Sequence, residues 1–541
     1  MFNISGNSID TVKLTEILRK YKAGKANLER RVISAENWWK LRNSFEENRP
    51  LLNSGEFACR SAWLHNVIVS KHADGMDDYP EPNILPREED DREEAELLSE
   101  IIPVVLEQNS FEETWSDVLW QKLKTGTGVY KVTWDRSLLN GLGDIRVERV
   151  DLLNLFWEPG VTDIQKSEYF FHTQLWNRRT LEQAYPELKG RLQVSDFEAA
   201  RFLYDDRVCD DGKVTVIDCY HKEGGRLEYV KYVGNTVLYA TENSEFGIRN
   251  SEFSPAAGLY EHGMYPFVFD PLFPVEGSPC GYGFVDICSN AQTQLDLMKT
   301  AYLKNILVGA VPRYFSRVDG SINEEELMDL TRPIIHADGN LGQDSLRIID
   351  YRPLPSNAMS MLTETVNELR ETTGNTETAT GTVHSGVTAA SAIAALQEAS
   401  GKGSRDSTRG SYRAYSRVIE LCIELIRQFY TAPRCFRITG KDGYSYVNYS
   451  NAGLRPRSQG SLGGMDLGMR RPVFDIRVEP EKKNAYTKLS QNELALQLYN
   501  AGLFAPGRER EARIALGMME FDGKQRIMDM LNQEVSYVNQ Q

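Results

Sequence analysis

The sequence of 541 residues contains no run of about 18 apolar residues, the length that a membrane-spanning helix needs. Residues 1–20 also lack the apolar core and the cleavage site of a secretory signal peptide. We therefore expect a protein that has no membrane partner and is not exported by a signal peptide.

Cysteine is scarce and follows no pattern. There is no CxxC pair, and the number of cysteines, seven, is odd. Scattered single cysteines are typical of free thiols in a reducing compartment and do not form a zinc site, so we expect no bound metal. The cysteines are Cys59, Cys209, Cys219, Cys280, Cys288, Cys422 and Cys435.

Motifs that hold nucleotides are absent. There is no GxxxxGK[ST] motif, and no GxGxxG opens a helix after a strand. Gly126 and Gly128 mark the point where residues 115–134 change from helical to alternating spacing, so we interpret them as a helix-to-strand turn. The sequence predicts no cofactor.

Positive charge is in deficit, and the formal net charge is -15. This argues against a protein that grips nucleic acid, because Lys and Arg supply most of the non-specific affinity for phosphates. It does not exclude a protein that lets DNA pass, since an acidic wall would keep the duplex from adhering. Hydrophobic residues make up 41% of the chain and charged residues 26%, which indicates a folded protein rather than a disordered one.

The length predicts roughly three or four structural units. In the first, residues 1–279, helical spacing over Ile9–Asn48 is followed by alternating segments that end at turn residues. We expect an antiparallel sheet with helices around it, an α+β unit. The alternating segments are Ile145–Val150, Val214–His221, Leu227–Val233 and Asn235–Ala240.

The central part of the chain is organised by long helices. We expect helices over Phe284–Val308 and from Asn357 to Thr372, and a third that closes at Tyr430. Residues 309–356 form a small mixed insert between the first two helices. The apolar stripes of these helices need neighbours from other copies or from other parts of the chain, so we interpret the region as the wall of a ring.

Residues 373–388 form a loop rich in small and hydroxylated residues. It contains six threonines and three glycines, and its only formal charge is Glu377. Hydroxyls can contact phosphates weakly without releasing many counterions, so the loop could touch DNA without holding it. A surface connection with no ligand is the alternative. The candidate contacts are Thr376, Thr378, Thr380, Thr382, His384 and Ser385.

The C-terminal third combines alternating segments, Phe436–Tyr449 and Pro472–Val478, with helical spacing near the end of the chain. An arginine-rich loop over residues 453–471 could contact DNA or could be a solvated connection.

Two other classes of protein are considered for the whole chain, a carboxylate-dependent hydrolase and a cytoplasmic scaffold without DNA. No pair of carboxylates stands out, so we expect no catalytic residue and no enzyme.

Several separated segments resemble, in order, the portal proteins of tailed bacteriophages, and the resemblance covers roughly Trp38–Phe504. The segments are DGMDDYPEPNILPREEDD, KTGTGVYKVTWD, DLLNLFWEPGVTDIQKSEYF, SGVTAASAIAALQEASGKGSRD and EPEKKNAYTKLSQNELALQLYNAGLF.

The resemblance implies a ring of identical subunits, usually a dodecamer, at one capsid vertex of the virion, with a channel for double-stranded DNA. It also implies a portal-type fold with a wing, a long-helix stem, a small α/β clip and a helical crown. The implied boundaries are wing 1–279, stem helix 280–308, clip 309–356, stem helix 357–372, channel loop 373–388, second part of the wing 389–483, and crown 484–541.

The partners follow from the same resemblance. The terminase large subunit would dock on the clip during packaging in the host bacterial cytoplasm, and head-tail adaptor or neck proteins would replace it. The major capsid protein and scaffold would surround the ring, and the genome would later be ejected through it. The candidate docking residues are Arg317, Glu324, Glu325, Glu326 and Asp329.

Overall fold

The computed structural model describes residues 10–41, 59–186, 212–241, 258–310, 353–375, 402–440, 443–458 and 469–480, with short stretches and single residues between and after them. The chain divides into two compact units. One comprises Met1–Gly75 and Pro82–Val478, and the other comprises Met76–Glu81 and Glu479–Gln541. The elements described below belong to the first unit unless their bounds show otherwise.

The two largest sheets of the described residues are antiparallel and lie in the first unit, which also contains two-stranded pairs. The smaller has the order β3-β2-β9, in which β2 (Thr127–Asp135) lies between β3 (Asp144–Arg149) and β9 (Phe267–Pro271). The larger has the order β4-β5-β6-β7-β8 and is a simple meander. Its strands are β4 (Leu155–Trp157), β5 (Tyr169–Asn177), β6 (Lys213–Glu223), β7 (Arg226–Val233) and β8 (Thr236–Ala240).

The helix-to-strand turn predicted at Gly126 and Gly128 is confirmed. Helix α4 (Phe111–Thr125) ends at Gly126, whose φ of 88° lies in the left-handed region that favours glycine. A Cβ atom on Gly128 would lie 2.4 Å from the Val118 side chain, so only glycine lets β2 start this close to α4. The four alternating segments also form strands, within one or two residues of their predicted bounds.

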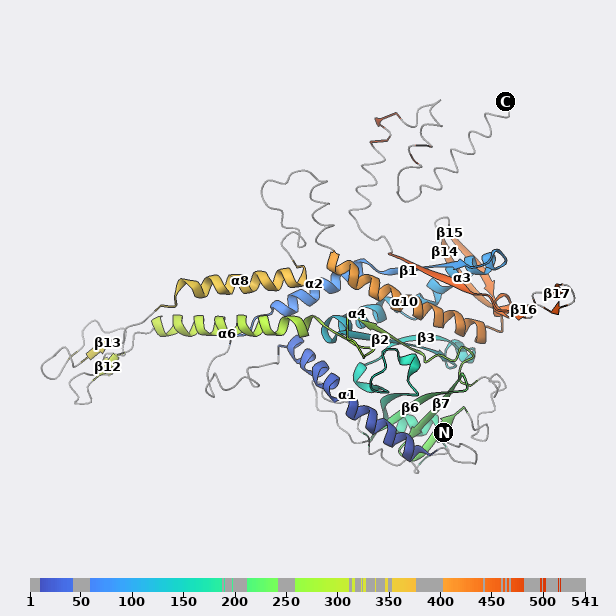
Figure 1. Cartoon of the computed structure of the whole chain (residues 1–541), viewed down its shortest axis with the longest axis horizontal. Helices are drawn as coiled ribbons and strands as arrows, with labels where there is room; N and C mark the ends of the chain where they lie inside the picture. Colours follow the sequence, from blue (N-terminus) through green and yellow to red (C-terminus); the bar gives the residue numbers. More distant parts are fainter. Residues whose placement is uncertain are drawn as a thin grey trace. The chain divides into compact units, whose positions relative to one another are not determined.

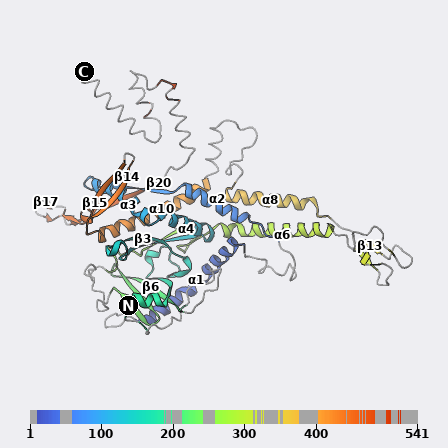
Figure 2. The same cartoon turned by 180° about the vertical axis from the view of Figure 1, so that it is seen from behind.

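Segments far apart in the sequence share the core beside the smaller sheet. Helix α10 (Lys402–Phe429) contacts β2 and β9. It also packs against α3 (Arg92–Gln108), and the two helices lie near each other in Figures 1 and 2. Tyr415 of α10 lies 5.6 Å from Phe111, measured between ring centroids, and both rings are buried. Gly403 lies in the first turn of this helix.

Helix α1 (Thr11–Trp39) packs on the larger sheet. Leu18 and Tyr21 bury against Phe171 of β5, Ile217 of β6 and Tyr232 of β7. This helix is shorter than the predicted span of residues 9–48, and residues 42–48 lie outside the described part.

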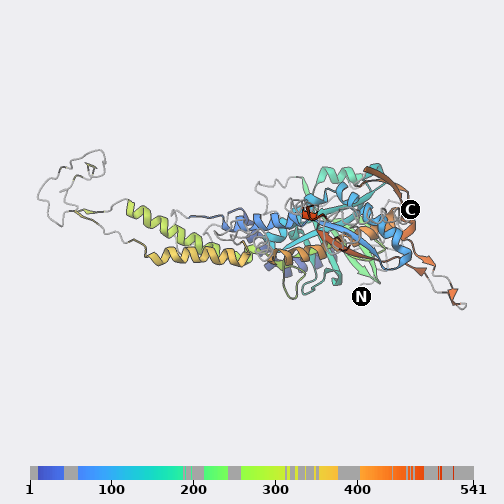
Figure 3. The same ribbon diagram turned by 90° about the horizontal axis from the view of Figure 1, so that it is seen from above.

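The two long central helices are present as predicted. Helix α6 (Phe284–Ala310) and helix α8 (Ser356–Thr373) run antiparallel and lie side by side in Figures 1 and 3. Between them, β12 (Tyr314–Ser316) pairs antiparallel with β13 (Leu346–Ile348). The mixture of helices with separate antiparallel sheets confirms the α+β class.

Several elements were not predicted from the sequence. Helix α2 (Trp63–Asp77) and strands β4, β5 and β9 lie in regions without a clean alternating or helical pattern.

The other described elements include the predicted alternating segments Phe436–Tyr449, which forms β14 and β15, and Pro472–Val478, which overlaps β20. A further helix is α5 (Arg178–Ala184). The remaining strands are β1 (Pro80–Pro86), β10 (Phe273–Pro274), β11 (Gly281–Tyr282), β14 (Arg434–Gly440), β15 (Gly443–Tyr449), β16 (Arg457–Ser458), β17 (Ser461–Leu462), β18 (Met465–Asp466), β19 (Met469–Arg470) and β20 (Phe474–Pro480). Short 3-10 helices include η2 (Glu89–Asp91), η5 (Ile164–Lys166) and η7 (Asn451–Leu454).

No helix in the described part of the chain is long and apolar enough to cross a membrane. Within the same residues no group of three or more His, Cys, Asp or Glu side chains is placed to hold a metal ion. Six of the seven cysteines are described and are free thiols.

Candidate functional site

The pair formed by α6 and α8 leaves large apolar side chains exposed at the end nearest the insert. On α6 these are Tyr302, Ile306 and Leu307, of which Leu307 is 59% exposed. On α8 they are Met359 and Met361, each more than half exposed. Exposed apolar side chains clustered at one end of a helix pair indicate a surface that another molecule or another part of the chain covers.

A row of polar side chains on α6 holds the start of α2. Gln292, Asp296 and Thr300 follow one another at four-residue spacing, so they lie on one side of the helix, and all three are buried. The Gln292 Oε1 accepts a hydrogen bond of 3.1 Å from the backbone N–H of Leu64, and the Asp296 Oδ1 accepts one of 2.9 Å from the N–H of Ser61. Burial raises the pKa of Asp296, and the hydrogen bonds from Ser61 oppose this shift. The row therefore fixes α2 to the long helix.

Helix α2 in turn holds both ends of the segment 376–401. At the end of α8, the Asn375 Oδ1 accepts a hydrogen bond of 2.8 Å from the Ser70 hydroxyl. At the start of α10, the Lys71 ammonium donates to the Ser404 hydroxyl over 2.9 Å, and Ser404 donates to Asp74 over 2.8 Å. The two ends of the segment are thus attached to one short helix.

A buried ion pair attaches the first half of α10 to the sheet. The Lys122 ammonium of α4 is fully buried and lies 2.8 Å from the Asp270 carboxylate of β9. The same ammonium donates to the Ser411 hydroxyl of α10 over 2.6 Å, and Ser411 donates to the other Asp270 oxygen over 2.8 Å. These three residues, which we call the Lys122 cluster, are all buried and join α4, β9 and α10.

The residues predicted to contact DNA lie outside the described part of the structure. They are Thr376, Thr378, Thr380, Thr382, His384 and Ser385. Of the predicted docking residues, Arg317, Glu324 and Asp329 also lie outside it. Glu325 is exposed, whereas Glu326 is partly buried and its Oε2 pairs with the Nδ1 of His336 over 2.9 Å.

Sequence reasoning missed the anchoring residues, namely Lys71, Lys122, Asp270 and Gln292. Only the row on α6 carried a signal, because Gln292, Asp296 and Thr300 recur at four-residue spacing and so lie on one side of the helix, although the helix has other polar residues as well. The two lysines and Asp270 look like ordinary surface charges in the sequence, and their burial depends on segments hundreds of residues away.

Part of the arginine-rich loop has a structural role. Arg470 forms ion pairs with Asp91, which is 1% exposed, and with Glu88 at 3.0 Å. Arg471 lies 3.8 Å from both Glu261 and Glu424. Two acidic residues just before α3 therefore bind Arg470. This use of Arg470 leaves it less available for DNA than the sequence alone suggested.

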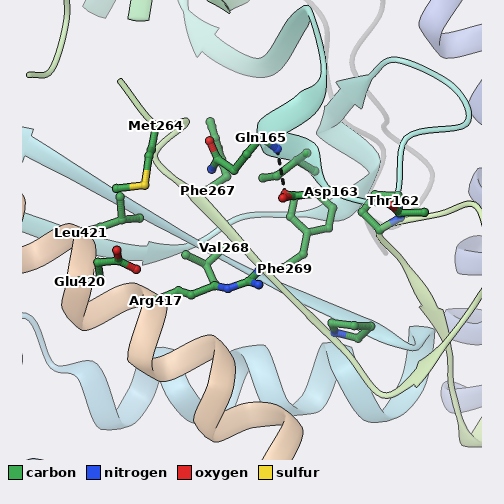
Figure 4. A pocket seen from close by; sticks show the side chains of 13 residues that line it. Thr162, Asp163, Gln165, Met264, Phe267, Val268, Phe269, Arg417, Glu420 and Leu421 are labelled. Carbon is green, nitrogen blue, oxygen red and sulfur yellow. Dashed lines mark hydrogen bonds between the residues drawn. The ribbon is translucent and has the colours of Figure 1, made fainter. Parts of the chain in front are cut away.

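A pocket of about 390 Å³ lies between β9, the short helix η5 and α10 (Figure 4). Its acidic side chains include Asp163 and Glu420. The Asp163 carboxylate accepts a hydrogen bond of 3.0 Å from the N–H of Gln165, so it caps η5. Glu420 lies next to Arg417 on the exposed side of α10. One capping carboxylate and one exposed carboxylate do not form the isolated acid pair that a carboxylate-dependent hydrolase requires.

Among the described residues, four histidines have a lowered pKa, and in each case burial is the largest cause: His72, His172, His221 and His262. For His262 burial, helped by the charges of Lys222 and Arg471, lowers the pKa to about 4. Its imidazole accepts a hydrogen bond from the backbone N–H of Met264 over 2.9 Å, which requires the unprotonated nitrogen.

The protein should lose stability in mild acid. A histidine whose pKa is lower in the folded state than in the unfolded state stabilises the fold above about pH 6.5, and this contribution is lost as the pH falls through the folded value. For His262 we expect a loss of about 3 kcal/mol between these limits, measured by urea unfolding at a series of pH values. His262→Asn should flatten the pH dependence; an unchanged slope would refute this assignment.

Comparison with known proteins identifies a family. A family model described as phage P22-like portal protein matches residues 77–263 and 318–541, which together are most of the chain. No curated protein matches the chain significantly.

Proposed function

The chain belongs to the phage P22-like portal protein family, and from this premise we propose that its copies close into a ring around the passage for double-stranded DNA. As a portal protein it is a component of the head-to-tail connection at a capsid vertex and takes part in DNA packaging. Packaging and ejection of the genome would both use the passage that the ring encloses. We assign it no catalytic residue.

The observation that carries the ring proposal, beside the family match, is the exposed apolar end of the α6 and α8 pair. Leu307 and Met361 are each more than half exposed, and burying such side chains stabilises an assembly by about 1.5 to 3 kcal/mol per residue. A ring covers the same surface on every subunit, because each copy contacts the next through a heterologous interface. Twelve copies is our proposed number.

We propose that α6 and α8 form the stem and residues 309–356 the clip, as in the boundaries given above. The sheets with α1, α3, α4 and α10 form the wing, and residues 484–541 the crown. The clip offers the exposed Glu325 to a partner. In this proposal the terminase large subunit binds the clip during packaging, neck or adaptor proteins bind it afterwards, and the major capsid protein and scaffold contact the wing.

Electron microscopy of the purified full chain tests the ring. We expect closed rings with a central hole, and a mass by light scattering that is a whole multiple of the 61.4 kDa chain. Leu307→Glu should reduce the fraction of the protein that assembles into rings, because it places a charge where the apolar contact would form. A protein that stays monomeric at high concentration and shows no rings would contradict the proposal.

A further inference from the structure

Helix α10 presents a face of arginines to solvent. Arg405, Arg409 and Arg413 are exposed and spaced four residues apart, and Arg417 continues the spacing at the pocket of Figure 4. Residues at this spacing lie on one side of a helix. The buried side chains of the same stretch, Ala414, Tyr415, Val418 and Ile419, lie on the opposite side. We call Arg409 and Arg413 the arginine face; Arg405 has an interaction of its own and is not counted in it.

Helix α8 presents a face of the opposite charge. Glu364, Glu368 and Glu371 are exposed and lie within one side of the helix, opposite the buried Val366 and Leu369. Together with Ser360, Thr363 and Asn367 they line an open groove along α8. We call Glu364, Glu368 and Glu371 the glutamate face.

Neither face is neutralised within the described part of the chain. No ion pair or hydrogen bond there involves the side chains of Arg409 or Arg413, and the same holds for the three glutamates. This contrasts with the other charges of the region: Lys71, Lys122 and Arg427 are each paired with an acid. Two opposite rows of charge therefore remain available on one molecule.

We propose that the arginine face of one copy binds the glutamate face of the next copy in the ring. The inference rests on the ring proposed above and names a surface by which it closes. A ring requires two different and complementary surfaces on each subunit, and these two rows supply them. Opposed rows of charge also fix the register of two subunits and disfavour a reversed orientation, since like charges would then meet.

A row of arginines could instead bind the phosphates of DNA, and two arguments disfavour DNA as the partner of this face. If the arginine face lined the passage, every copy would add several phosphate contacts, and the summed binding would oppose sliding of the duplex. The net charge of -15 also means that a neighbouring copy is on average an acidic surface. A second copy thus satisfies the arginines, and it satisfies the glutamates of α8 at the same time.

Charge reversal on each face tests the contact. The variants are Arg409→Glu with Arg413→Glu, Glu364→Arg with Glu368→Arg, and the fourfold exchange that combines them. Each double variant should require at least about tenfold more protein for half-maximal ring assembly, because like charges then face each other. The fourfold exchange should restore assembly, since opposite charges again meet. Assembly is measured by light scattering and electron microscopy, and thermal unfolding checks that each variant folds.

A matched control keeps the charge change and moves it elsewhere. Lys20 and Lys166 are exposed, so Lys20→Glu with Lys166→Glu changes the net charge by the same amount as the arginine variant but should leave assembly unchanged.

Wild-type-like assembly of both the arginine and the glutamate double variants would overturn the inference and leave the ring itself intact. So would a fourfold exchange that fails to restore rings. The inference would also be overturned if the arginine variant formed normal rings that only failed to retain DNA, because the arginine face would then be assigned to DNA binding. Absence of rings in the unmodified chain would instead refute the proposed function.

Discussion

Replacing Lys122 with methionine should destabilise the protein by about 3 to 5 kcal/mol. The substitution removes the ammonium that pairs with Asp270 at 2.8 Å, and it leaves a carboxylate that is 2% exposed with the Ser411 hydroxyl as its remaining hydrogen-bond donor in the Lys122 cluster. A buried charge without its counter-ion carries most of its desolvation cost. The free energy of unfolding, measured in urea, gives the effect directly.

The double variant separates the ion pair from the packing of the side chains. Asp270→Asn in the Lys122→Met background removes the unpaired charge while keeping the shape of the site, so it should recover part of the lost stability. Lys20→Met, at an exposed position of α1, is the matched control and should change stability by less than about 0.5 kcal/mol. A loss below about 1 kcal/mol for Lys122→Met would show that the cluster contributes little.

Deleting residues 376–386 should leave rings intact and prevent the production of stable, genome-filled particles. The deletion removes most of the threonine-rich loop, which we propose contacts the duplex in the passage. It spares Gly374, which ends α8 with a φ of 68°, and Asn375, which binds Ser70. Because both anchors to α2 remain, we expect folding and ring assembly to persist. Particles assembled with the variant are scored by electron microscopy for ring shape and by nuclease-protected DNA.

A second variant keeps the loop length and removes only its hydroxyls. Changing Thr376, Thr378, Thr380 and Thr382 to alanine should reduce retained DNA less than the deletion does, since the backbone groups and the bulk of the loop remain. Particles of the deletion variant with a normal DNA content would refute a role for the loop.

Local patterns predicted the long helices and the regular strands, and long-range contacts account for what was missed. Apolar residues at helical spacing located α6 and α8 within two residues at each end, because such spacing is required wherever one face of a helix is buried. Strand β9 was not predicted, since it is short and ends in Pro271, yet it pairs with β2 over five residues. Its partner lies more than a hundred residues earlier, and no local pattern records that pairing.

For the candidate site, the sequence predicted the position of the loop in the chain but not the residues that attach it to the fold. Small hydroxylated residues between two helices indicated the loop at 373–388, but its attachment to α2 depends on Ser70, Lys71 and Asp74, which no motif marks. Helix α2 itself was missed, since its apolar residues are interrupted by Lys71, His72 and Asp74. The burial of Lys71 by distant segments is what allows a lysine on that face.

The packing of α10 on the smaller sheet, β3-β2-β9, has a consequence for synthesis of the chain. Phe111 and Trp115 are covered by Tyr415, and Trp134 stacks on Phe429 with ring centroids 4.6 Å apart. A ribosome that has translated only the first 280 residues has therefore produced the strands of that sheet without their cover. Until about residue 430 has emerged, the nascent chain exposes these aromatic rings, so that interval is when the growing polypeptide is most prone to aggregate and most in need of a chaperone.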